Sequence, residues 1–494
     1  MKRSILICAL CLLLPLSACG GGGGQAVVHD DAPVSAQPVQ PAAVAALEPA
    51  AWEGGGERTA EIRSLSYDLG EQAVDGAAVP IRGWLALPEE GESLPLVLIL
   101  HGNHAGGQAE ARFDEGFSYL AEYLARRGYA AASLDLQSAY ARRDDDVWTA
   151  EIARAHLDLL RRAGGGEALF PLDLTGRLDP DRVILVGHSR GGDAALNLAC
   201  AWEEAAGVCA VAPNLRQAEK DWRDIPAAIL VPQLDGDVDT MDGYAYLWPR
   251  QRAGLENPTV LTLLEGANHN FFNAKLTGDD AEPYGGAALT GAEQRDFLCR
   301  YAADFCDAVT GRGGEGFLDP AGALPGTRYG LPVHELWLSG EMELLSDAGR
   351  AAAVWNCQTR RLTVDAHTTD LRIPLSWGTE QTLTFWEGSW EGTEGALDLP
   401  LGRGDLGGFS ALALDLAAVE KVEGLSLVLT DREGNSAAVA LGALEPLRSG
   451  SGYTLFSQVR LPLDLFQGVD LDHIARCSLL AEGGTVWVSA VWGC

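Results

Sequence analysis

The strongest constraint on the fold is a regular alternation of continuous apolar runs with helical patterns between residues 81 and 309. The run at 95–100 (PLVLIL) has almost no polar position, which is typical of a strand buried on both faces of a parallel sheet. Strands that alternate with helices predict an α/β fold with a doubly wound, mostly parallel sheet. The expected strands are 81–87, 95–100, 130–136, 182–186, 207–212, 227–232 and 259–264, and the expected helices are 117–127, 150–162, 192–201 and 290–309.

The composition changes on both sides of this region. Residues 19–57 are rich in Gly, Ala, Pro and Gln and lack hydrophobic periodicity, which predicts a flexible tether. A second Gly- and Pro-rich stretch at 313–331 predicts a linker that ends an α/β domain at 58–312. From 332 to 494 short alternating runs stand between turn sequences, a pattern typical of an all-β sandwich with antiparallel strands.

The first eighteen residues have the pattern of an export signal. Lys2 and Arg3 precede an apolar run at 5–14, which is too short to span a bilayer. The segment 16–20 (LSACG) resembles the lipoprotein box of bacterial signal peptides, which implies cleavage after residue 18 and a lipid on Cys19. A protein exported to the cell envelope, with the lipid as its only membrane anchor, is therefore expected; Gly20 would fit outer-membrane sorting. The alternative is a plain secretory signal.

Net charge and cysteine content limit the binding partners and the cellular compartment that can be expected. The formal net charge of −33 argues against nucleic acid and anionic membrane surfaces as partners. Seven cysteines follow Cys19, so an exported chain is expected to form some disulfides and to leave at least one thiol over. Cys200 and Cys209 are candidates for a pair. No Cys or Cys/His cluster has zinc spacing, and no metal is expected.

A candidate nucleophile stands between a predicted strand and a predicted helix. Residues 187–191 (GHSRG) match G-x-S-x-G and follow the apolar run at 182–186. In a nucleophile elbow the two glycines allow a turn too tight for side chains, and the turn lifts the serine hydroxyl above the sheet. The following helix points its positive end at that hydroxyl. The pattern predicts Ser189 as nucleophile; the alternative is a Gly-rich turn without chemistry.

A serine nucleophile needs a base, and the loop after the last predicted strand offers His269. The alternative is a loop histidine bonded to backbone. His101, His104 and His188 are weaker candidates, because they lie in turns where backbone donors rather than bases are needed.

The orienting acid is expected after the strand at 227–232, where 233–239 (QLDGDVD) offers three carboxylates. Asp237 is favoured, because it takes the Asp position of a strand-end G-x-x-D in which Leu234 replaces the Gly. Asp239 is the alternative acid, counted from Gly236, and Asp235 is the least favoured of the three.

Two backbone amides are expected to form an oxyanion hole for the charge that develops on the substrate. One is the amide of Arg190, directly after the candidate nucleophile, and the other is the amide of Asn103, in the loop after the run at 95–100. An ordinary strand-end loop is the alternative for the second position.

Four segments, HGNHAGG (101–107), GHSRGG (187–192), LDGDV (234–238) and GANHNFFN (266–273), stand in this order. Over roughly residues 60–310 the chain resembles the dienelactone hydrolase, chlorophyllase-like and polyester hydrolase side of the α/β-hydrolase superfamily. The resemblance implies an esterase or lipase with a Ser-Asp-His triad and no cofactor. The chain departs from that pattern at Arg190, where Met or Gln is common, and at Leu234, where Gly is common.

The region 332–494 loosely resembles galactose-binding-like jelly-roll modules, which implies a possible contact with polysaccharide. Exposed tryptophans would stack on sugar rings, but burial in the core is the favoured interpretation of the tryptophans in this region. They are Trp337, Trp355, Trp377, Trp386, Trp390, Trp487 and Trp492.

The predicted function is hydrolysis of carboxylic esters, with a small-molecule or polymeric ester as substrate. Three alternatives remain open. In the first, the chain would be a surface lipoprotein that binds glycan or polymer on a non-catalytic hydrolase scaffold. In the second, it would be an esterase that deacylates polysaccharides, with the sandwich as targeting module. In the third, it would be a serine peptidase on the same fold.

Overall fold

The computed structural model describes residues 44–47, 50–56, 59–104, 111–216, 220–318, 324–348, 364–374, 376, 380–391 and 396–494. The predicted signal peptide, Cys19 and most of the predicted tether lie outside these ranges. No helix in the described ranges combines the length and the apolarity that a bilayer crossing requires.

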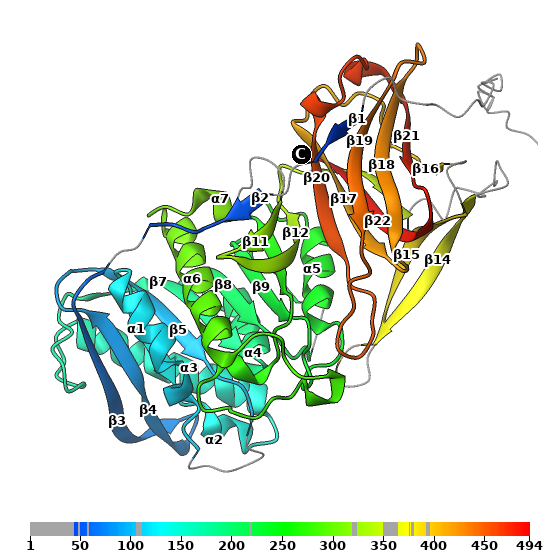
Figure 1. The fold of residues 1–494 in the computed structure, drawn as a ribbon. Helices are drawn as coiled ribbons and strands as arrows, with labels where there is room; N and C mark the ends of the chain where they lie inside the picture. Colours follow the sequence, from blue (N-terminus) through cyan, green and yellow to red (C-terminus); the bar gives the residue numbers. More distant parts are fainter. Residues whose placement is uncertain are drawn as a thin grey trace, which may run out of the picture. The chain divides into compact units, whose positions relative to one another are not determined.

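The larger part of the described chain is built on one eleven-stranded sheet, in the spatial order β2–β11–β12–β10–β9–β8–β7–β5–β6–β4–β3 (Figure 1). The strands are β2 (Ala50–Trp52), β3 (Ile62–Val74), β4 (Ala77–Pro88), β5 (Leu94–Leu100), β6 (Ala130–Leu134), β7 (Leu178–His188), β8 (Ala205–Val211), β9 (Ala227–Pro232), β10 (Thr259–Leu264), β11 (Pro325–Arg328) and β12 (Leu331–Leu338).

The sheet is mixed. Its six central strands, from β10 to β6, pair in parallel. At one side β4 and β3 continue the sheet antiparallel, and at the other β12 and β11 do the same. All residues of β5, β6 and β10 are buried, as their continuous apolar sequences predict for central strands. The prediction of an α/β architecture is therefore confirmed, and the sheet is mixed where a mostly parallel one was expected.

Helices cover both faces of this sheet (Figure 1). The apolar sides of α1 and α6 share one buried cluster with one face, and those of α3, α4 and α5 share another with the opposite face. The helices are α1 (Ser118–Arg126), α2 (Gln137–Tyr140), α3 (Asp145–Gly164), α4 (Arg190–Ala201), α5 (Asp242–Arg252), α6 (Gly291–Thr310) and α7 (Glu315–Leu318).

The C-terminal part is all-β, as predicted. A five-stranded sheet in the order β1–β19–β18–β21–β16 faces a six-stranded group in which β14–β15–β22–β17–β20 follow one another and β13 also pairs with β22. Leucines and valines of both sheets form a common core. The strands are β1 (Val44–Ala46), β13 (Glu343–Asp347), β14 (Val364–Pro374), β15 (Glu380–Trp390), β16 (Leu397–Leu399), β17 (Ala411–Ala418), β18 (Val422–Asp431), β19 (Ser436–Leu444), β20 (Ser457–Pro462), β21 (Ile474–Leu480) and β22 (Gly484–Gly493).

The predicted domain boundaries at 312, 313–331 and 332 are wrong. The stretch taken as a linker contains α7 and β11, and residues 333–338 of β12 pair with β10 of the first sheet. The last part of the predicted tether is also structured, since β2 pairs with β11 and β1 with β19. β11 has only four residues and begins with Pro-Gly, so its local composition resembles a linker although it pairs with β12 and β2.

The expected disulfide between Cys200 and Cys209 is not formed. Cys200 lies in the last turn of α4 on one face of the sheet, whereas the Cys209 side chain belongs to the cluster on the opposite face. The six cysteines within the described ranges, Cys200, Cys209, Cys299, Cys306, Cys477 and Cys494, are free thiols. Cys357 lies outside those ranges.

The favoured interpretation of the tryptophans is confirmed where they are described. Trp337, Trp386, Trp390 and Trp492 are buried, and Trp487 is half-buried and stacks on Phe385. Trp355 and Trp377 lie outside the described residues. The buried rings stabilise the cores and offer no surface to a sugar.

A buried ion pair fixes the edge of the first sheet. Arg328 of β11 donates from Nε to Glu335 Oε1 at 2.6 Å and from Nη2 to Oε2 at 3.0 Å. Both residues are at most 3% exposed. Thr262 of β10 donates to the same carboxylate at 2.7 Å, so the pair connects three strands.

Replacement of Arg328 by Met should destabilise the fold by about 3–5 kcal/mol, because Glu335 would keep a buried charge without a partner. The double variant R328M/E335Q should recover much of that loss. Chemical denaturation measures both, with R162M as a control at the exposed Arg162–Glu167 pair, where little change is expected. A double variant no more stable than R328M would contradict this account of the pair.

Candidate functional site

The predicted site residues gather at one edge of the first sheet. Asn103 follows β5, Ser189 follows β7, the segment 235–239 follows β9, and His269 follows β10. These strands are parallel and belong to one run of neighbours in the sheet. Their carboxyl ends therefore share an edge. The strand order reverses between β5 and β7, and ligands of open α/β sheets bind at such a switch point.

Ser189 lies in a strained turn between β7 and α4. Its backbone has φ 58° and ψ −126°, a conformation that a residue with a side chain rarely adopts. The turn is closed tightly: a Cβ on Gly187 would lie 2.0 Å from the carbonyl oxygen of Gly191, and a Cβ on Gly191 would lie 2.2 Å from that of Leu100. Both glycines of the G-x-S-x-G pattern are thus required by backbone contact.

Backbone hydrogen bonds hold this turn in place. The Ser189 amide donates to the Val211 carbonyl at 2.9 Å, and the Ser189 carbonyl accepts from the amides of Gly192 at 2.8 Å and Asn214 at 3.2 Å. The serine is only 2% exposed. The strained conformation is therefore fixed from β8 and from the first turn of α4 together.

The side chain of Arg190 anchors the start of α4. It is buried and forms ion pairs with Asp145 at 3.1 Å and Asp193 at 3.6 Å, and also pairs with Asp146. Since these carboxylates come from α3 and α4, the guanidinium fixes the residue whose amide was predicted as an oxyanion donor. The second predicted donor, Asn103, lies in the loop that packs against this turn, because a Cβ on Gly102 would be 2.6 Å from Ser189 Cβ.

His269 is fully buried, and its Nδ1 lies 2.9 Å from Oδ2 of Asp235. The other carboxylate oxygen of Asp235 accepts the amides of Asp237 at 3.0 Å and Val238 at 2.6 Å. The prediction of Asp237 as the orienting acid is therefore wrong, and so is its alternative Asp239, whose side chain is exposed. Asp235 is the residue that contacts Nδ1, because the chain turns directly after it and the turn points the later carboxylates away from that nitrogen.

Asp237 instead lies on the other side of the imidazole. Its Oδ2 is 3.4 Å from His269 Nε2, and its side chain is 57% exposed. The ring is thus flanked by a buried carboxylate at Nδ1 and a solvent-facing carboxylate at Nε2. Within the described residues Nε2 has no hydrogen-bond partner, so no hydrogen bond joins it to Ser189 in this structure.

Sequence reasoning missed Asp280, which connects the two loops. Its carboxylate accepts the amides of Gly236 at 2.8 Å, His269 at 3.1 Å and Asn270 at 2.9 Å. One side chain therefore fixes the loop of the acid relative to the loop of the histidine. Only its acidic character was visible in the sequence, since no motif spacing marks it.

Three further histidines surround the site. His188 Nε2 donates to the His269 carbonyl oxygen at 3.1 Å, and burial lowers the pKa of its ring well below the usual value. Burial also lowers the pKa of His104 well below that value, and the charge of the nearby His269 lowers it further. His101 Nε2 accepts the Leu136 amide at 2.9 Å.

The two carboxylates determine the charge of His269. Burial alone would lower its pKa, but Asp235, through its charge and its hydrogen bond, and Asp237, through its charge, raise it to about 9. The ring therefore favours its protonated form at neutral pH and has to lose the proton on Nε2 before it can act as a base.

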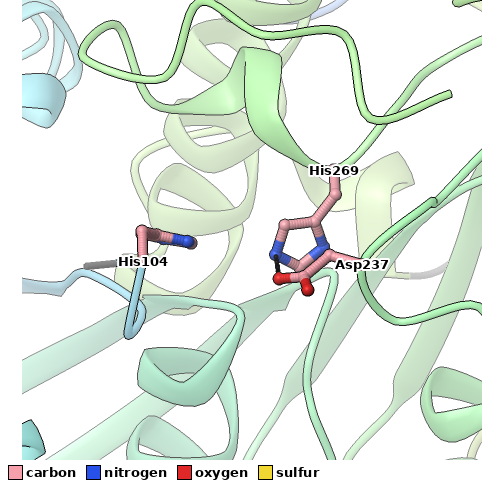
Figure 2. A group of neighbouring side chains, drawn as sticks. All are labelled: His104, Asp237 and His269. Atoms are coloured by element: carbon pink, nitrogen blue, oxygen red, sulfur yellow. Dashed lines mark ion pairs between the residues drawn. The ribbon is translucent and has the colours of Figure 1, made fainter. Parts of the chain in front are cut away.

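His104, Asp237 and His269 also form a compact group (Figure 2). One ligand-type atom from each residue lies within 4.8 Å of the others. The three residues come from the loops after β5, β9 and β10, which is why no spacing in the sequence indicated them.

No known family model matches this chain. No curated protein matches it either. The site combines a serine at a strained strand-to-helix turn, a buried histidine–aspartate pair at the same edge of the sheet, and two loops with backbone amides.

The His269 ring should titrate above its ordinary pKa of about 6.5. NMR titration of histidine-labelled, chelator-treated protein, with H269Q to assign the signal, measures this value. In D237N the pKa should fall, because one of the charges that raise it is removed, whereas D239N should leave it in place. An equal shift in both variants would show a general charge effect and contradict the proposed contact.

Proposed function

We propose that this chain is an exported serine hydrolase that cleaves carboxylic esters, and that its first domain has the α/β-hydrolase fold. The observation that carries the proposal is the backbone of Ser189, which is held at φ 58° at the carboxyl edge of the sheet that also carries the His269–Asp235 pair. A strained serine between a central strand and a helix is the arrangement in which this chemistry occurs.

In the proposed reaction Ser189 Oγ attacks the acyl carbon of the ester while His269 Nε2 accepts the hydroxyl proton. Asp235 keeps the ring oriented through Nδ1 and stabilises its cation. His269 then gives the proton to the departing alcohol, and an acyl-enzyme remains on Ser189. Water attacks the acyl-enzyme by the same proton transfers in reverse, which releases the acid and restores the serine.

The negative charge on the acyl oxygen requires donors that are in place beforehand. The amides of Arg190 and Asn103 are the proposed donors, since both belong to loops that contact the Ser189 turn. The ion pairs of the Arg190 side chain support this role, because they fix the first residue of α4.

Topology supports the assignment of the fold. The order Ser, Asp, His along the chain is that of α/β-hydrolases, and the three residues follow β7, β9 and β10. The strands β11, β12 and β2 extend the sheet beyond β10 and are a feature of this chain. Export and the lipid on Cys19 rest on the sequence of residues 1–20 alone.

The absence of a hydrogen bond between Ser189 and His269 is compatible with the mechanism. Catalytic hydrogen bonds are often long or misaligned in free enzymes and tighten when substrate binds. Asp237 lies next to Nε2 and is largely exposed, so its side chain is free to leave when an ester enters.

The purified protein should react with a fluorophosphonate probe and hydrolyse p-nitrophenyl acetate or butyrate. S189A should lose both properties, with hydrolysis falling by about 10⁴-fold or more, because no other group replaces the nucleophile. S138A, at another buried serine hydroxyl, is the control. Activity retained in S189A would remove Ser189 from the mechanism, and cleavage of peptides but not esters would favour a peptidase.

The three carboxylates after β9 should differ in their effects. D235N should lower kcat by about 10⁴-fold, because an amide leaves the ring in the wrong tautomer. D239N should have the activity of the unmodified chain, and D237N should retain most of it. Steady-state kinetics on the same ester decides the order; a loss in D237N as large as that in D235N would contradict the assignment of Asp235.

A further inference from the structure

We propose that His104, Asp237 and His269 form a binding site for a zinc ion, and that zinc at this site blocks hydrolysis. The inhibitory part rests on the proposed function, whereas the site itself rests on the geometry of the three side chains. Figure 2 shows the three residues converging on one point from separate loops.

The spacing of the group is close to that of a zinc site. Ligands at tetrahedral zinc lie about 3.4 Å from one another, given zinc–ligand bonds of about 2.0–2.2 Å. Asp237 Oδ2 and His269 Nε2 already stand at 3.4 Å, and the three ligand atoms lie within 4.8 Å. The Asp237 side chain is 57% exposed, so it can adjust toward the ion without disturbing the core.

Two buried nitrogens at this point make no hydrogen bond with the described part of the chain, and one of them, His269 Nε2, lies 3.4 Å from the Asp237 carboxylate. Nε2 of His104 and Nε2 of His269 are both buried, and neither has a hydrogen-bond partner among the described residues. His269 as a whole is 0% exposed. Buried polar atoms are rarely left without a partner, so two in one place point to a ligand. A zinc ion would satisfy both, replacing the proton on His269 Nε2.

The surroundings of His269 also match a metal ligand. A histidine that binds zinc through one ring nitrogen usually donates from the other to a carboxylate, which fixes the ring and strengthens the ligand. Here His269 Nδ1 is 2.9 Å from Asp235, and Asp235 is held by two amides. The same contact that orients a base therefore also orients a ligand.

The donor set selects the class of metal. Two imidazoles and one carboxylate suit zinc, whereas calcium and magnesium prefer sites made entirely of oxygen. Three protein ligands leave a fourth position open. Ser189 lies close to the ligand atom of His104, because Ser189 Cβ and His104 Nε2 come within 2.6 and 2.7 Å of the same point next to Gly102.

Occupation of this site should stop the proposed reaction. Zinc would take the electron pair of His269 Nε2, and that pair is the one that must accept the proton of Ser189. The ion would also lie where the ester has to approach. Zinc is therefore expected to act as a reversible inhibitor that a chelator removes.

The test uses the full-length chain, treated with a chelator, and equilibrium dialysis against Zn²⁺. The unmodified chain should bind one zinc ion that H104Q and D237N bind about tenfold or more weakly. D239N, which removes the same charge two residues away, and H334Q, which removes a histidine elsewhere, are the matched controls and should bind zinc normally. Equal binding by D237N and D239N, or by H104Q and H334Q, would overturn the site.

Two further measurements separate the site from the hydrolase. S189A should bind zinc as the unmodified chain does. Zinc binding by an unmodified chain that shows no esterase activity would count against the proposed function and not against the site. Zinc should lower ester hydrolysis by the unmodified chain more than tenfold, and a chelator should restore it. Activity lost with the chelator and regained with zinc would overturn the inhibitory role.

Discussion

The hydrogen bond between His269 and Asp235 is the interaction on which the chemistry of this edge depends. It fixes the orientation of a fully buried imidazole and leaves Nε2 directed toward the loops after β5 and β9. The bond is itself supported, since Asp235 accepts two amides and Asp280 accepts three more from the adjoining loops. Two carboxylates that touch no reacting atom thus determine where the reactive nitrogen stands.

The turn at Ser189 shows how the fold maintains a costly conformation. A serine at positive φ costs on the order of 1–3 kcal/mol and persists only where its surroundings leave no alternative. Here Gly187 and Gly191 approach backbone so closely that neither can carry a side chain, and β8 and α4 bind the serine backbone on both sides. The strain is therefore offset by many hydrogen bonds and contacts of the surrounding sheet.

One nitrogen has two possible partners in this arrangement. A base has to release its proton to be active, and a metal ligand has to release the same proton to bind. Asp237 raises the pKa of His269 and also offers an oxygen as the third metal ligand. Its carboxylate therefore affects both proton binding and metal binding at His269. The competition between proton and metal follows from placing an exposed carboxylate beside an otherwise buried imidazole.

Much of the fold could be predicted, because central strands and amphipathic helices leave a strong periodic signal. Each of the predicted strands 95–100, 130–136 and 227–232 lies within about two residues of β5, β6 and β9. The segments β2 and β11 were missed because they have only three and four residues and stand in Gly- and Pro-rich sequence, and β12 was assigned to the sandwich because it follows that sequence. Their membership in the sheet depends on pairing with distant strands, which local composition does not encode.

The sequence by itself determined the alternation of strands and helices, Ser189 between its two glycines, and a histidine after the last parallel strand. Only the tertiary structure decided which of three neighbouring carboxylates reaches Nδ1, that Asp280 joins the two loops, and that His104 meets Asp237 and His269. The reason is physical: local patterns govern backbone geometry over a few residues. Side chains from separate loops are brought together only when the parallel strands align their carboxyl ends.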